Sequence, residues 1–83
     1  MEPRDLEMTI LGQTVRLSRG QVVSSLARIA PETIQIHAVD IGGTRYPVKQ
    51  AFAIVTGLDP LDFTTTQARR AFKQLGFEVI RIR

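Results

Sequence analysis

TRYPVKQAFAIVTGLDPLDFTTTQARRAFKQLGF, residues 44–77, is the part of the sequence that decides the fold. Pro47 suits the first position of a helix, because the N–H that proline lacks has no intrahelical partner there. This helix is expected to end at Gly57, since glycine readily adopts the left-handed conformation that closes a helix. A second helix is expected to begin with Thr64, which is followed three residues later by glutamine in a capping box, and to end at Gly76.

Two hairpins are predicted before and at the start of this stretch. Residues 8–17 contain two short β-prone runs around Gly12-Gln13, and glycine at the first turn position suits a type II′ turn. A strand over 33–41 leads into Gly42-Gly43, which suits a type I′ turn because both of its central residues need positive φ. The return strand is expected over 44–46.

The remaining elements complete an α+β fold. Ser18 starts a capping box, and the helix that follows is expected to stop before Pro31. Residues 77–82 alternate like a final strand. The predicted order is ββ-α-ββ-α-α-β, with one small, mostly antiparallel sheet and helices packed on it. A chain of this length predicts a single domain over residues 1–83, with residues 1–6 flexible.

Composition excludes several classes of site. The chain has no cysteine and a single histidine, His37, so disulfides, thiolate zinc sites and histidine clusters are excluded. We expect neither a metal nor another cofactor. The polar start MEPRDLEM does not resemble a signal peptide, and the longest apolar run is far short of the ~20 residues that span a bilayer. We therefore expect a cytoplasmic protein that does not enter membranes.

The net charge of +3 is unevenly distributed along the chain. Residues 1–44 carry four basic and five acidic side chains, whereas residues 45–83 carry seven basic and three acidic ones. This asymmetry favours one basic face. Nine of the eleven basic residues are arginine, whose planar guanidinium suits phosphate or guanine.

The exposed side of the helix expected after Thr64 carries Arg69, Arg70 and Lys73 and no acid. These residues are close on a helical surface, and such a face suits phosphates or a DNA groove. The alternative is a solvated face that keeps a small domain soluble.

Other residues extend this prediction. Thr64, Thr65 and Thr66 offer hydroxyls near free N–H groups at a helix start, which suits a phosphate, although capping alone accounts for one of them. Four further cations are expected to enlarge the positive surface: Arg45, Lys49, Arg81 and Arg83. The simpler explanations are a core-edge role for Tyr46 in the segment that contains Arg45 and Lys49, with the role of Lys49 left open, and a polar edge strand at the end of the chain.

Catalytic patterns are missing from the sequence. It has no phosphate-binding glycine loop and no nucleophile elbow, and its aspartates lack metal-ligand spacing. We therefore expect a protein that is not an enzyme.

Residues 34–80 resemble the N-terminal head module of McrA-like HNH restriction endonucleases. That module has a hairpin-to-helix segment G-x-x-Y-x-x-K, then D-F, then a helix ending in L-G-F-E-V. Where the family usually has a serine-glycine-glycine turn after D-F, this chain has three threonines. The matching residues are Gly43, Tyr46, Lys49, Asp62, Phe63, Leu75, Gly76, Phe77, Glu78 and Val79.

The resemblance implies a small accessory module associated with DNA or with defence proteins, and it transfers no catalytic residue. Together with the basic helix, it leads us to expect a DNA-binding domain linked to restriction, defence or transcription regulation. A protein-interaction or homodimerising module is the alternative, because the strand expected over 78–82 is suited to pairing with another chain.

Overall fold

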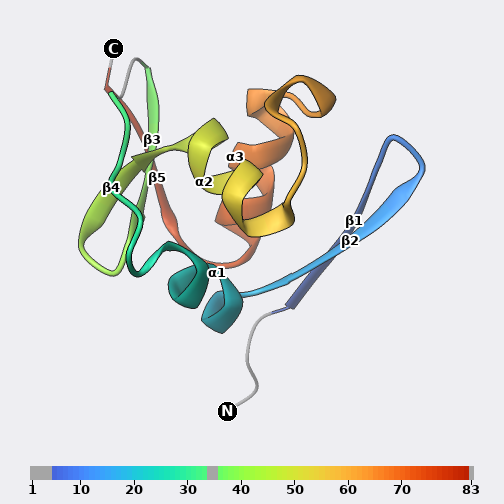
Figure 1. The fold of residues 1–83 in the computed structure, drawn as a ribbon, viewed down its shortest axis with the longest axis horizontal. Coiled ribbons are helices and arrows are strands. Elements are labelled where there is room, and N and C mark those ends of the chain that lie inside the picture. Colours follow the sequence, from blue (N-terminus) through green and yellow to red (C-terminus); the bar gives the residue numbers. More distant parts are fainter. Residues whose placement is uncertain (1–4, 34–35, 83) are drawn as a thin grey trace.

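The order of elements follows the sequence prediction in the computed structural model, which describes residues 5–33 and 36–82 (Figure 1). The fold class is α+β, as expected. The strands and helices are β1 (Asp5–Ile10), β2 (Gln13–Ser18), α1 (Arg19–Leu26), β3 (His37–Ile41), β4 (Thr44–Pro47), α2 (Val48–Thr56), the 3-10 helix η1 (Pro60–Asp62), α3 (Thr65–Gln74) and β5 (Glu78–Arg81).

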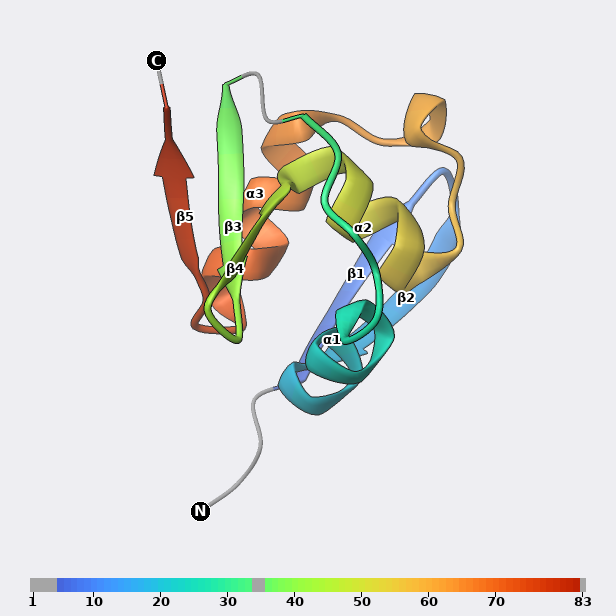
Figure 2. The same cartoon turned by 60° about the vertical axis from the view of Figure 1, so that its left-hand side comes forward.

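The strands form two sheets, so the expectation of a single sheet is wrong. Strands β1 and β2 pair with each other, and the other three form an antiparallel sheet in the order β4-β3-β5. Helices α2 and α3 lie between the two sheets (Figures 1 and 2). Each helix thereby has apolar neighbours on two sides, which a single sheet would not supply.

The first hairpin differs from the prediction in its start and its turn. Residues 5 and 6 belong to β1 and pair with β2, so they are not a flexible end; residues 1–4 lie outside the described part of the chain. The turn is formed by Leu11 and Gly12, with φ of 50° and 78°, rather than by Gly12 and Gln13. Two positive φ values are typical of type I′.

The turn of the second hairpin confirms its prediction, although β3 begins at His37 and not at residue 33. Gly42 and Gly43 have φ of 60° and 89° and connect β3 to β4, as a type I′ turn requires. Asp40 accepts a hydrogen bond from the Gly43 N–H at 3.0 Å, which fixes the turn further.

Helix α2 lies at the centre of the core. Phe52 is fully buried and contacts the rings of Phe63 and Phe72 edge-to-face, with centroids 4.7 and 6.0 Å away. These distances are in the range in which aromatic pairs add to simple burial. The helix ends at Gly57 with φ of 75°, as predicted.

Helix α3 has the predicted capping box. The Thr64 hydroxyl accepts from the Gln67 N–H at 3.1 Å, and the Gln67 side chain accepts from the Thr64 N–H at 2.8 Å. Gly76 follows the helix with φ of 87° and lets the chain turn into β5.

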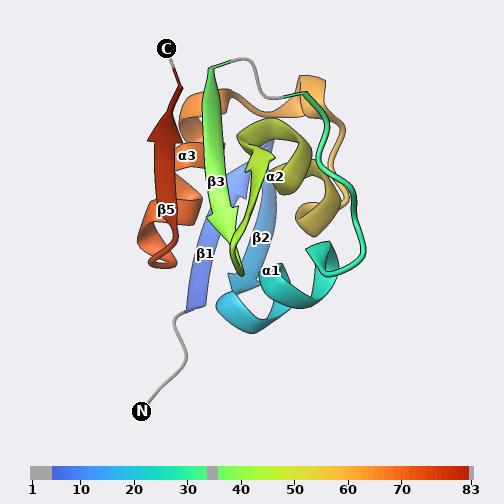
Figure 3. The ribbon, with the colours of Figure 1, turned by 90° about the vertical axis from the view of Figure 1, so that its left-hand side faces the viewer.

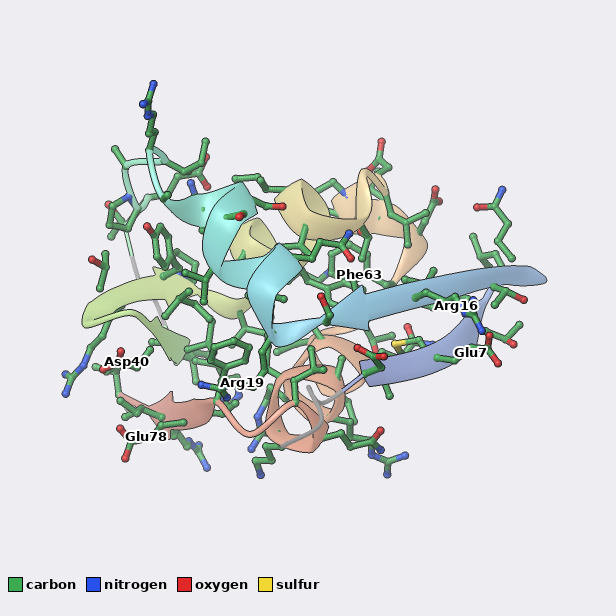
Figure 4. All side chains as sticks on the ribbon, turned by 90° about the horizontal axis from the view of Figure 1, so that it is seen from below. Glu7, Arg16, Arg19, Asp40, Phe63 and Glu78 are labelled. Atoms are coloured by element: carbon green, nitrogen blue, oxygen red, sulfur yellow. The ribbon has the colours of Figure 1, made fainter. Side chains whose placement is uncertain are left out.

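Helix α1 ends at Leu26, several residues earlier than the apolar residues before Pro31 predict. Its first residue ties it to the far end of the chain. The Arg19 guanidinium donates to the Leu75 carbonyl oxygen at 2.9 Å and lies 4.2 Å from the centre of the Phe77 ring (Figure 4).

Candidate nucleic-acid interface

The helices cover only one face of the three-stranded sheet (Figure 3). Val39 and Ile41 of β3 belong to the core, so the odd-numbered residues of this strand face the helices. His37 therefore points to the helix side, and Arg81 lies directly opposite it on β5. These two residues stand at the end of the sheet that lies away from the Gly42-Gly43 turn.

Helix α3 brings two further cations to the same place. Arg69 and Lys73 are one turn apart, on the helix that packs against β5. Burial lowers the pKa of His37 below its ordinary value of 6.5, and the charges of Arg69, Arg81 and Lys73 lower it further. We call His37, Arg69, Lys73 and Arg81 the cationic cluster.

Two atoms of the cationic cluster are buried without a hydrogen-bond partner among the described residues. They are Nε of Arg69 and Nδ1 of His37. Buried polar atoms in folded proteins nearly always have a partner, so a water molecule or a bound group is expected to reach each of these two atoms. The exposed side chain of Lys73 stands at the outer side of the same place.

Arg70 is separated from the cationic cluster, although it neighbours Arg69 in sequence. It lines a hollow with Leu6, Glu7 and Met8 of β1. Adjacent residues of a helix project about 100° apart, so α3 presents Arg69 to the three-stranded sheet and Arg70 to the first hairpin.

Arg45 lies on the opposite face of the three-stranded sheet. Its neighbour Tyr46 is in the core, so Arg45 points away from the helices. It lies opposite Asp40, which is itself opposite Glu78 on β5. Figure 4 shows Asp40 and Glu78 close together at this end of the sheet. Arg45 therefore faces acids and does not extend the cationic cluster.

Lys49 is held by the protein itself. Its ammonium group donates to the Pro60 carbonyl oxygen at 2.8 Å and lies 5.2 Å from the centre of the Phe63 ring. The residue joins the η1 turn to the start of α2. Gln50 is also engaged, because its amide contacts the backbone of Ala30 and Glu32.

The three threonines have different surroundings. Thr64 uses its hydroxyl in the capping box, and Thr66 is exposed. Thr65 is half-buried and lines a pocket of about 320 Å³ together with His37. Arg83, which was expected to extend the positive surface, lies outside the described residues.

This pocket lies beside the cationic cluster, between the starts of β3, α2 and α3. The sequence places His37 in the strand expected over 33–41 but does not reveal its place at the pocket. The alternation of Val39 and Ile41 with His37 was the signal that would have indicated it. The described lining residues are Glu32, Thr33, Ile36, His37, Pro47, Val48, Lys49, Gln50 and Thr65.

A larger hollow of about 380 Å³ lies at the base of the first hairpin, where Glu7 and Arg16 are among its lining residues. These two form a salt bridge of 2.9 Å across the strands (Figure 4). The charges of Glu7 and Arg16 in this hollow are thus paired with each other. We therefore assign the candidate site to the end that carries the cationic cluster.

A family model described as SCO5918-like matches residues 8–83, nearly the whole chain. The chain belongs to the SCO5918-like family. The matched residues run from within β1 to the end of the chain, so they include the cationic cluster and the pocket. No curated protein and no solved structure matches the chain significantly.

Two kinds of feature are missing from the described part of this SCO5918-like chain. Residues 5–33 and 36–82 contain no group of three or more histidine, aspartate or glutamate residues placed to hold a metal ion. None of the helices in those segments is long and apolar enough to cross a membrane.

Proposed function

We propose that this protein is a non-enzymatic, cytoplasmic DNA-binding module, and that the cationic cluster is its contact with the phosphate backbone. The observation that carries the proposal is the convergence of Arg69 and Lys73 from α3 with His37 and Arg81 from the sheet. Contacts to phosphate form a large share of all protein–DNA contacts, and arginine and lysine supply many of them.

The unpartnered Nε of Arg69 supports the same proposal. A phosphate oxygen, or a water bound to one, is a suitable acceptor for a guanidinium N–H. The charges that shift the pKa of His37 are all positive, so the cluster favours an anion. Association with restriction or defence proteins, or with transcription regulation, is the wider context that we propose from the sequence resemblance.

The test is the salt dependence of binding to labelled duplex and single-stranded DNA, followed by fluorescence anisotropy between about 50 and about 200 mM salt. The slope of log affinity against log salt should be about −0.9 per phosphate contact for a duplex and about −0.7 for a single strand. Replacement of Arg69 and Lys73 by glutamine should therefore flatten the slope by about 1.8 or about 1.4.

The matched control is Arg45→Gln, which removes a positive charge from the opposite face of the sheet. Its slope should equal that of the unaltered protein. The proposal is wrong if the Arg69 and Lys73 double variant keeps the original slope and affinity, or if no DNA binds at the lower salt concentration. Circular dichroism of each variant separates a loss of binding from a loss of folding.

A protein-interaction module is the second candidate, and the position of β5 favours it. β5 is at one edge of the sheet, and Ile36 and Ile82 beside it are 48% and 46% exposed. An edge strand next to exposed isoleucines is suited to pairing with another chain. Light scattering over a range of concentrations tests self-association, and a constant monomer mass would exclude the homodimer.

A further inference from the structure

The pocket beside the cationic cluster suggests what kind of nucleic acid binds. Its volume of about 320 Å³ lies within the range that small organic groups occupy in proteins. The pocket opens between the starts of β3, α2 and α3, and these starts lie at one end of the molecule (Figure 3). His37 lines it and also belongs to the cationic cluster, so the two features share a residue.

The lining of the pocket is suited to a flat, partly polar group. Ile36, Pro47 and Val48 supply apolar surface. His37 adds a planar ring, and Thr65 adds a hydroxyl that can donate or accept. Nucleobases present the complementary combination, an apolar face with hydrogen-bonding edges.

The distribution of charge places the base and the backbone differently. Glu32 lines the pocket, and a carboxylate repels phosphate but accepts hydrogen bonds from an N–H group of a base, such as N3–H of thymine. Arg69, Lys73 and Arg81 act on His37 but are not among the described residues that line the pocket. A strand crossing this end of the molecule is therefore best matched with its phosphates on the cations and a base in the pocket.

The wall of the pocket that the start of α2 forms is held in place by hydrogen bonds. Lys49 is bonded to the Pro60 carbonyl oxygen, and the Gln50 amide is bonded to the Ala30 carbonyl oxygen and the Glu32 N–H. These bonds hold the start of α2 against both neighbouring segments. A ligand therefore meets a wall whose polar groups do not need to be reordered, which favours binding.

We propose that this pocket receives one unpaired base of a single-stranded nucleic acid whose adjoining phosphates lie on the cationic cluster. The inference rests on the proposed function, because it takes the cluster as the backbone contact. It narrows the ligand from DNA in general to a single strand, since a duplex base must first be unpaired and unstacked before it can enter a side pocket, which costs free energy.

The experiment compares three labelled ligands at one salt concentration: a thymine-bearing single strand, an abasic strand with the same number of phosphates, and a duplex. The thymine-bearing strand should bind about 5- to 50-fold more tightly than the abasic strand, as expected for one stacked base. It should also bind more tightly than the duplex. A uracil-bearing RNA strand included beside them shows which sugar the site prefers.

The outcomes separate this inference from the proposed function. Equal affinity for the thymine-bearing and abasic strands would overturn the inference and leave phosphate binding intact. Tighter binding of the duplex would also overturn it. If no ligand binds, the proposed function is wrong and the inference is wrong with it.

A pair of variants in the first turn of α3 locates the effect. Thr65→Phe fills the pocket, whereas Thr66→Phe adds the same ring to the exposed neighbouring position. The Thr65 variant should bind the thymine-bearing and abasic strands equally, and the Thr66 variant should keep the difference between them. Preference for the thymine-bearing strand that survives in folded Thr65→Phe protein would place the base elsewhere and overturn the inference.

Discussion

The two ends of the three-stranded sheet differ in how their charges are arranged. At the Gly42-Gly43 end, Arg45 lies opposite Asp40, and Asp40 lies opposite Glu78, so this end carries two acids and one arginine. At the other end, the cationic cluster places Arg69 and Lys73 of α3 and Arg81 of β5 around His37 of β3. Positive charges held together cost stability. The comparison motivates the proposal that the end with the cationic cluster binds an anion, whereas the Gly42-Gly43 end carries no excess of positive charge.

The largest effect should follow from removing the support of the cationic end. Phe63→Ala deletes a buried ring that packs on Phe52 and underlies Lys49, and it should lower the free energy of unfolding by about 3–5 kcal/mol. Urea denaturation measures this loss. Leu61→Ala is the matched control, because Leu61 is 91% exposed two residues away and its loss should change stability by less than about 0.5 kcal/mol. Equal losses would contradict the description of this end.

A change at the Gly42-Gly43 end should affect stability without affecting binding. Gly43→Ala places a side chain at φ of 89°, where nothing crowds the new Cβ, so the cost is conformational and about 1–2 kcal/mol. Thermal unfolding and anisotropy on the same sample test both parts. A variant that stays folded but binds DNA more weakly would show that the two ends are coupled.

The pH dependence of stability should report the cationic end alone. The folded protein holds the pKa of His37 below 6.5, so the unfolded chain takes up protons more readily. The free energy of unfolding should therefore fall as the pH drops below about 6.5, and stop falling below the lowered pKa of the folded state. The charged groups around His37 are Arg69, Lys73, Arg81 and, across the pocket, Glu32 and Lys49.

The control for this experiment is His37→Asn, which removes the titrating group. The difference in stability between the two proteins should change with pH in that window and stay constant above it. Bound DNA should oppose the trend, because phosphate favours protonated His37. If the difference in stability does not change with pH, His37 does not titrate under the influence of the cationic cluster and this prediction is wrong.

The smallest effects should have opposite signs at the two ends. Lys73→Gln removes one member of a like-charged pair with Arg69, four residues before it, and should raise stability by about 0.2–0.5 kcal/mol at low salt. Arg45→Gln removes a cross-strand partner of Asp40 and should lower stability by about 0.2–1 kcal/mol. Both effects should shrink in high salt. The same sign for both variants would contradict the comparison.

The sequence predicts well where local chemistry determines conformation. Gly42 and Gly43, Thr64 with Gln67, and Gly57 each act within a few residues, and the structure confirms all three predictions. The pairing of strands depends on contacts between distant segments, which explains why one sheet was expected and two are found.

The candidate site shows the same limit. Arg69 and Arg70 are equivalent as letters, and only the packing of α3 between the sheets separates them. Arg45 was expected on the positive surface, but it points away from the helices because its neighbour Tyr46 packs in the core. The sequence of a short strand does not reveal by itself which side faces the core. His37 was missed because its neighbours at the cluster come from α3 and β5.

The contacts of Arg19 with Leu75 and Phe77 have a consequence for folding kinetics. The bond of Arg19 to the Leu75 carbonyl oxygen joins residues that are 56 positions apart, so it closes a loop that contains most of the chain. Contacts of such long range tend to form late, after the local hairpins and helices. Loss of the Arg19 side chain should therefore speed unfolding more than it slows folding. The Arg19 contacts therefore lengthen the lifetime of the native state and have little effect on the folding rate.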